Sequence, residues 1–229
     1  MHHAGRCADG HGDRDDRAFF GQYNGLRDQS TYGLIDFDYA RRREADGTLV
    51  SLVGTNLGLQ TRELGLLWQR QGDWRFTADC GELIRRDPYT IDTGIAGAGS
   101  TAPQVVYLAG GVGSGYDYDP KTKRQSLGLG FSKWFGTELE LVAGVKSENK
   151  QGSNFWGIGF NCPALAAPGC GPTTAISTSS AVLFLPQPID SNHTQVDLRL
   201  HYLGDKLRVS GGYYGSFYNN EYGTVNPGV

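Results

Sequence analysis

Four cysteines, at positions 7, 80, 162 and 170, are the residues of this sequence with the most distinctive chemistry. No Cys-x-x-Cys-His segment is present, so the chain carries no attachment site for a c-type haem. Cys162 and Cys170 bound a short loop that contains Pro and Gly. In an oxidising compartment this pair favours a disulfide over a metal site.

The amino-terminal residues gather carboxylates and imidazoles, which are potential cation ligands. Oxygen-rich loops suit Ca²⁺, but the spacing here does not match an EF-hand loop with its final Glu. We therefore interpret residues 1–17 as a polar, solvated tail. The residues concerned are Asp9, Asp13, Asp15, Asp16, His2, His3 and His11.

Motifs for enzymatic chemistry do not emerge from the rest of the chain. The glycine run 110–115 lacks the Gly-x-Gly-x-x-Gly spacing and the strand–helix context of a nucleotide site. The chain also lacks a Gly-x-Ser-x-Gly nucleophile elbow and a His-Glu-x-x-His zinc motif. We expect a protein that is not an enzyme and that has no catalytic, cofactor-binding or metal residues of its own.

Composition points to strands. The 229 residues carry a formal net charge of −3, which offers no large basic surface for nucleic acid. Glycine is frequent at 34 residues, aromatic residues make up 11%, and methionine occurs once. No stretch approaches the roughly 20 apolar residues of a membrane-spanning helix. This lack of a long apolar stretch is compatible with a sheet that crosses a membrane, because only alternate residues of a strand meet lipid.

Strict alternation of polar and apolar residues predicts about eight antiparallel strands. The clearest pair covers residues 195–202 and 207–217, with a turn at Gly204-Asp205. The polar side is expected to face a lumen at Asp197, Arg199, His201, Glu138, Glu140 and Lys146. The apolar side is expected to meet lipid, or to form aromatic girdles, at Trp74, Phe76, Leu198, Leu200, Tyr202, Val209, Tyr213 and Phe217. Cys80 shares the apolar parity.

The first predicted pair is less regular. One face is expected to hold Gly33, Ile35, Phe37 and Tyr39, and the other Asp36, Asp38 and Arg41. The direction of this strand requires an earlier one, either missing or near Phe19–Tyr23.

The unequal lengths of the connections indicate which end of the sheet faces the periplasm and which faces the outside of the cell. Short turns alternate with two long loops, at about 86–124 and 150–193. Outer-membrane barrels have short periplasmic turns and long extracellular loops, whereas structureless loops of this length are uncommon in compact soluble domains. The fold class predicted is all-β: residues 18–229 form part of an antiparallel transmembrane β-barrel, about eight strands of a larger one. Its charged interior suits a wide lumen.

A series of short segments occurs in a consistent order over most of 21–229. They are Gly21–Asp28, Tyr32–Asp36, Arg86–Tyr89, Lys121–Arg124, Lys133–Phe135, Phe160–Pro163, Pro168–Cys170, Leu185–Ser191 and Ser210–Phe217. Taken together, the series resembles the MtrB/PioB family of decahaem-associated outer-membrane proteins, on its PioB side.

This resemblance implies a bacterial outer-membrane barrel that sheathes a periplasmic decahaem cytochrome c and supports extracellular electron transfer, for iron oxidation or metal reduction. Haem c would belong to that partner, and an extracellular multihaem cytochrome and membrane lipid would be further partners. A passive porin or solute channel is the alternative. The chain departs from some family members in having only Cys7 where they carry a Cys-x-x-Cys pair. Since it also lacks a secretory signal and the later strands, we expect a fragment.

Overall fold

The computed structural model describes residues 2–9, 14–24, 26, 31–106, 110, 113–161 and 180–228, which form two compact units. Unit 1 comprises Met1–Arg85, Lys123–Lys150 and Ser191–Asn219, and unit 2 comprises Arg86–Thr122, Gln151–Asp190 and Asn220–Val229. No helix in the described part of the chain is long and apolar enough to cross a membrane.

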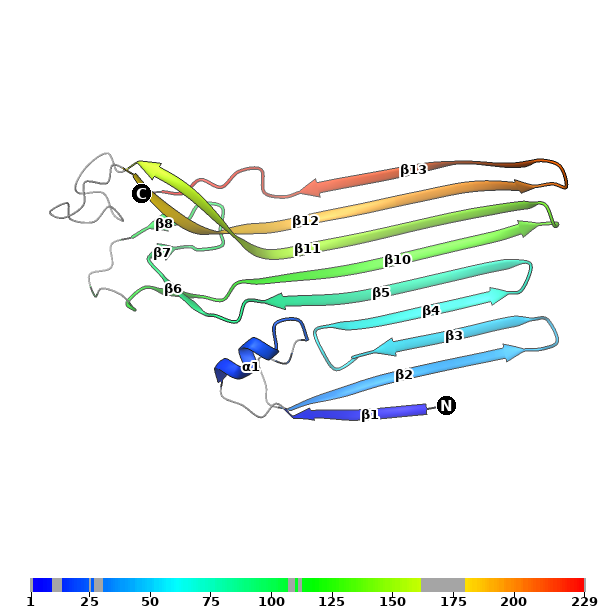
Figure 1. Ribbon diagram of the computed structural model, residues 1–229, viewed down its shortest axis with the longest axis horizontal. Coiled ribbons are helices and arrows are strands. Elements are labelled where there is room, and N and C mark those ends of the chain that lie inside the picture. The colour runs from blue at the N-terminus through cyan, green and yellow to red at the C-terminus, as the bar shows by residue number, and fades with distance from the viewer. Residues whose placement is uncertain are drawn as a thin grey trace. The chain divides into compact units, whose positions relative to one another are not determined.

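Unit 1 is built on an antiparallel sheet whose strands follow the order β1-β2-β3-β4-β5-β10-β11-β12-β13 (Figure 1). Because β1 and β13 end this order, the sheet of the described residues is open, as expected for part of a barrel wall. The strands are β1 (His2–Asp9), β2 (Thr31–Arg43), β3 (Thr48–Thr55), β4 (Arg62–Arg70), β5 (Trp74–Arg86), β10 (Lys121–Phe135), β11 (Leu139–Asn161), β12 (Ser180–Leu203) and β13 (Arg208–Asn220).

Tight turns at one end join neighbouring strands, as the sequence predicts. Gly47, Gly72 and Gly136 occupy them with φ of 67°, 74° and 72°. Such positive values favour glycine because it has no Cβ to collide with the backbone. The turns make each pair a hairpin, and the hairpins pair side by side.

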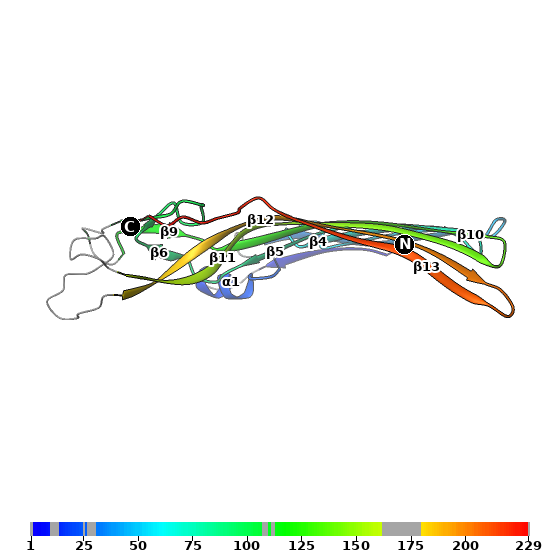
Figure 2. The ribbon, with the colours of Figure 1, turned by 90° about the horizontal axis from the view of Figure 1, so that it is seen from above.

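The sheet of unit 1 is one layer thick when seen along its edge (Figure 2). The buried apolar side chains that the structure describes in this unit are few: Ala18, Leu59 and Ile84. A soluble domain instead packs one face of a sheet against another layer. Among the described residues, the sheet of unit 1 therefore has almost no buried core. Its apolar side chains need an apolar environment that these residues do not supply.

The amino terminus differs from the predicted tail over residues 1–17. His2–Asp9 forms β1 and pairs with β2, and helix α1 covers Arg14–Phe20. The strand that the parity of β2 requires is thus present, but not near Phe19–Tyr23. The polar composition of residues 2–9 did not indicate β1, because pairing with a neighbour satisfies the backbone groups of a strand even where the sequence is polar.

The predicted long loops are wrong in extent. β10 already begins at Lys121, β11 continues to Asn161, and β12 begins at Ser180. Gly152, Ser153 and Asn154 are of types common in turns, yet they lie within β11.

Unit 2 also holds four short strands: β6 (Ile91–Thr93), β7 (Ile95–Ala96), β8 (Gln104–Val105) and β9 (Tyr116–Tyr118). β6 pairs with β9 and β7 with β8, so the region 86–124 is not structureless. The hydroxyl of Tyr118 donates to Ser153 Oγ at 2.5 Å.

Candidate functional site

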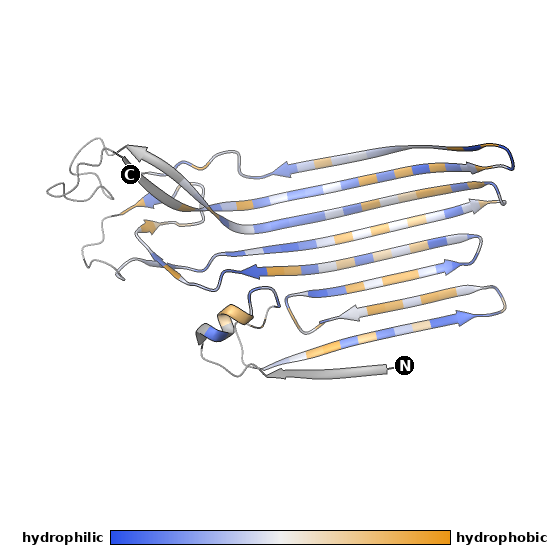
Figure 3. Ribbon diagram, in the orientation of Figure 1, coloured by the Kyte–Doolittle hydropathy of each residue, from blue (hydrophilic) through white to orange (hydrophobic). Residues whose placement is uncertain are grey.

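The two faces of the sheet in unit 1 differ in chemistry, and the strand register defines them. Residues directly opposite each other in an antiparallel pair share a face. The pairs Val50↔Trp68, Leu52↔Leu66, Leu64↔Cys80, Leu66↔Ala78 and Trp68↔Phe76 lie on one of them, the apolar face. Figure 3 shows the corresponding alternation of hydrophobic and hydrophilic residues along the strands.

Large apolar side chains on this face are exposed. The exposed fraction is 53% for Leu127, 45% for Leu198 and 47% for Leu200. Burying such a side chain stabilises a protein by about 1.5–3 kcal/mol, and soluble monomers rarely expose a continuous apolar surface of this kind. Lipid is the environment that removes the whole face from water.

Aromatic rings lie at the turn end of the apolar face. Trp68 and Trp74 meet edge to face, with ring centroids 5.0 Å apart. Their neighbour Arg70 is opposite Trp74 in the register. This combination is typical of the girdles at the edge of a membrane-spanning apolar band.

The opposite, polar face continues across β5, β10, β12 and β13. A Cβ on Gly81 would lie 3.2 Å from Ser126 Oγ, and a Cβ on Gly130 would lie 2.5 Å from Thr77 Oγ1. Asp79, Ser126, Gly128 and Gly130 therefore share this face, and His193 contacts Ser216 Oγ at 2.8 Å further along it.

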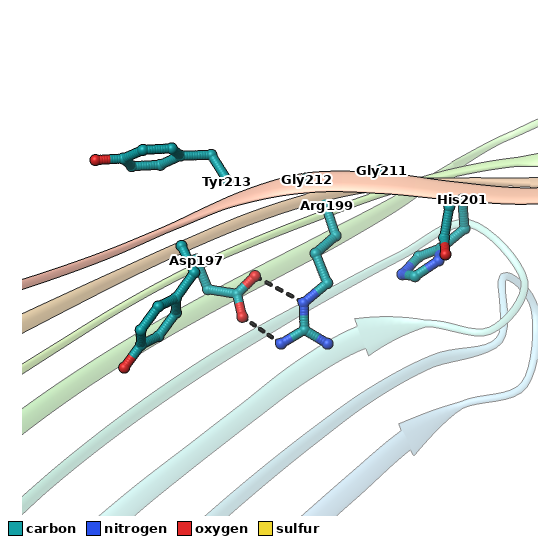
Figure 4. A pocket seen from close by; sticks show the side chains of 8 residues that line it. Asp197, Arg199, His201, Gly211, Gly212 and Tyr213 are labelled. Atoms are coloured by element: carbon teal, nitrogen blue, oxygen red, sulfur yellow. Dashed lines mark hydrogen bonds and ion pairs between the residues drawn. The ribbon is translucent and has the colours of Figure 1, made fainter.

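An ion pair within one strand marks the polar face of β12. Arg199 Nε donates to Asp197 Oδ1 at 2.8 Å, and Nη2 of the same guanidinium contacts Oδ2 (Figure 4). The contact is bidentate, which gives the pair a defined relative orientation. With His201, Gly212 and Tyr214 they line a hollow of about 440 Å³.

Two further hollows on the same face, of about 380 Å³ and 260 Å³, share Thr77, Gly130, Gly144 and Asp197. Glycine at 130 and 144 leaves the backbone of β10 and β11 accessible from the polar side. The face thus combines charges of both signs with places where another molecule can approach the sheet closely. Alternation in the sequence already assigns both glycines to the polar side, Gly130 with Ser132 and Gly144 with Lys146, but it does not predict the hollows.

The predicted polar residues fall into three groups. Asp197, Arg199 and His201 lie together around one hollow, while Glu140 and Lys146 line the other two. Glu138 is not on a strand face but in the turn between β10 and β11, where its carbonyl accepts the Leu203 N–H at 2.7 Å.

The strand register assigns two of the predicted apolar residues to a face, and the other six are exposed. Trp74 and Phe76 are on the apolar face by register. Leu198, Leu200, Tyr202, Val209, Tyr213 and Phe217 are exposed. One residue of the first pair was placed incorrectly: Arg41 is opposite Val50 and shares the apolar face, because its parity is that of Tyr39.

The structure describes only some of the cysteines and potential metal ligands that the sequence analysis considered. Cys162 and Cys170, the predicted disulfide, lie outside the described residues. Cys80 is a free, exposed thiol. Within the described ranges, no three His, Cys, Asp or Glu side chains gather as metal ligands would.

A single-layer antiparallel sheet with an exposed apolar face, a charged opposite face and aromatic rings at its turn end defines the wall of an outer-membrane β-barrel. Residues 12–228 match the family model described as outer membrane beta-barrel porin, MtrB/PioB, and the chain belongs to that family. It is accordingly a protein of the bacterial outer membrane. No curated protein matches the chain.

Proposed function

We propose that the polar face lines a lumen that houses a periplasmic decahaem cytochrome c, and that this assembly carries electrons across the outer membrane. Iron oxidation and metal reduction are the processes that such a conduit serves. The haem groups belong to the partner, and this chain contributes a housing rather than catalysis. An extracellular multihaem cytochrome is the proposed partner at the outer end.

The observation that carries the proposal is the polar face itself. The charges of its ion pair Asp197–Arg199 balance each other, and Gly130 and Gly144 line a hollow beside it. A surface of mixed charge with several shallow hollows suits contact with a folded macromolecule better than retention of one small ligand.

Lipid on the other face completes the insulating role. Backbone groups of the central strands are satisfied by their neighbours, so the wall excludes water and ions from the hydrocarbon region. Electrons then cross only through the haem groups of the enclosed partner.

Isolation of the complex tests this function. The full chain is purified from its native membrane in mild detergent, and haem staining identifies any protein that migrates with it. We expect a haem-stained partner in stable proportion. A correctly folded preparation that never retains one would overturn the proposal.

A passive channel is the second candidate, favoured by the family description as a porin and by the hollows of the polar face. Solute flux into liposomes that contain this protein alone distinguishes it. Rapid flux that a bound haem protein does not reduce would favour the channel.

A further inference from the structure

Two similar clusters of charge lie on the apolar face of unit 1, one near each end of the same three strands. The first, the loop-end triad, consists of Arg62, Glu82 and Lys123. The second, the turn-end triad, consists of Arg70, Asp73 and Lys133. Each has an Arg from β4, a Lys from β10, and a carboxylate from β5 or the turn before it.

The loop-end triad converges on one carboxylate. Arg62 Nη2 lies 3.4 Å from Glu82 Oε2, and Lys123 Nζ lies 3.2 Å from Oε1. Gln125 Nε2 also donates to Oε2 at 3.0 Å. The Glu82 side chain is only 10% exposed, whereas those of Arg62 and Lys123 are 54% and 39% exposed. The carboxylate therefore lies beneath two accessible cations.

The turn-end triad repeats this arrangement. Arg70 Nη1 lies 3.8 Å from Asp73 Oδ2, and Lys133 Nζ contacts Oδ1. Each triad has two cations and one carboxylate, so each carries a net charge of +1. A guanidinium has five N–H donors and an ammonium three, so a contact with the carboxylate does not exhaust either group.

The spacing of the triads matches a membrane. Arg62 and Arg70 are eight residues apart on β4, and Lys123 and Lys133 are ten apart on β10. At about 3.3 Å per residue and a tilt of about 40°, these separations correspond to roughly 20–25 Å across the membrane. The apolar band of an outer-membrane barrel is about 25 Å tall. Leu64, Leu66 and Leu129 lie between the two clusters.

We propose that each triad binds the phosphate of a lipid headgroup, the loop-end triad in the outer leaflet and the turn-end triad in the periplasmic leaflet. The location fixes the occupant, because cations that adjoin the apolar band on its lipid side meet headgroups there. Their charge complements phosphate, and donors from two strands can hold two oxygens of the same group. This inference does not involve the haem partner, so its failure leaves the housing function untouched.

Native mass spectrometry of the full chain in detergent provides the test, with phosphatidylglycerol and a phosphate-free galactosyl diacylglycerol as probes. We expect retention of phosphatidylglycerol and not of the glycolipid. The double variant R62Q/K123Q should weaken phosphatidylglycerol binding at its site by about 10-fold or more. The control R75Q/R199Q removes two cations from the polar face and should leave lipid binding unchanged.

A second variant separates lipid binding from a purely structural ion pair. Glu82→Gln keeps both cations and removes the competing anion, so retention should equal or exceed that of the parent protein even if R62Q/K123Q fails to fold. Loss of retention in E82Q, or equal retention of both lipids by the parent protein, would overturn the proposal. Displacement of the bound lipid by excess inorganic phosphate would likewise show a free-anion site rather than a lipid site.

Discussion

Leu66 of β4 lies directly opposite Ala78 of β5 on the apolar face of the sheet. The next residue, Leu67, lies opposite Thr77 on the polar face. Leu66 and Leu67, which are adjacent in sequence, thus lie on opposite faces of the sheet.

Arginine substitution at these two positions should have unequal effects. L66R places a charge in the hydrocarbon region and should lower the free energy of unfolding by about 2–4 kcal/mol. L67R places it on the aqueous side and should cost less than about 1 kcal/mol. Urea unfolding in lipid vesicles measures both, and an equal or larger cost for L67R would contradict the assigned faces.

Thiol labelling tests the same alternation on β5. Cys80 belongs to the apolar face and Asp79 to the polar one. With the other cysteines replaced by serine, Cys80 in membranes should react slowly with a charged maleimide and rapidly with a lipid-soluble one. The variant D79C/C80S should show the reverse preference. If Cys80 reacts with the charged reagent as fast as D79C does, the apolar face is not in lipid.

Alanine at two neighbouring glycines of β13 should also have different costs. A Cβ on Gly212 would collide with the backbone carbonyl of Leu198, whereas one on Gly211 meets nothing within 4 Å. Since a backbone atom cannot rotate away, G212A should destabilise the sheet by about 1–3 kcal/mol. G211A should be nearly neutral in the same unfolding assay, and the opposite order would contradict the packing of β12 on β13.

Asp46, in the turn between β2 and β3, should contribute an acid-dependent part of the stability. The backbone N–H of Thr48 donates to Oδ1 at 3.1 Å, and with a smaller contribution from Arg43 this lowers the pKa of the carboxyl below its usual 3.8. A carboxyl whose pKa is lower in the folded than in the unfolded protein contributes stability at pH values above its unfolded pKa. This contribution is lost as the pH falls through the folded pKa.

The variant D46N should therefore be less stable than the parent protein at pH 7, and the difference should shrink as the pH falls below the ordinary carboxyl pKa and vanish only below the folded pKa of Asp46. Unfolding curves across this range measure it. R43Q should remove a smaller part of the same difference. A stability gap between D46N and the parent that persists unchanged into acid would show that the charge of Asp46 has no role.

Period-two alternation was enough to predict the hairpins β2–β3, β4–β5, β10–β11 and β12–β13, although it placed Arg41 on the wrong face. Residues such as Trp74, Phe76 and Leu198 could be assigned because one wrong register would turn every apolar side chain toward water. Gly72 and Gly136 marked the turns because only they readily adopt positive φ there.

Pairing that depends on partners distant in sequence was harder to predict. β1 is stabilised by pairing with β2, which composition does not reveal, and α1 is only seven residues long. Glu82 and Lys123 are 41 positions apart, so their meeting requires knowing that β5 is followed in the sheet by β10. The short strands of unit 2 interrupt what looked like a loop for the same reason.

Photo-crosslinking from two adjacent residues of β13 tests the central claim most directly. Tyr213 and Tyr214 both border the hollow around Asp197 and Arg199, but Figure 4 shows the Tyr213 ring on the opposite side of β13 from that pair. A benzophenone amino acid is introduced at either position in cells that make the native outer-membrane complex. We predict a haem-stained adduct from position 214 and only lipid adducts from position 213. Absence of a haem-stained adduct from position 214, or its equal yield from both positions, would contradict the housing function.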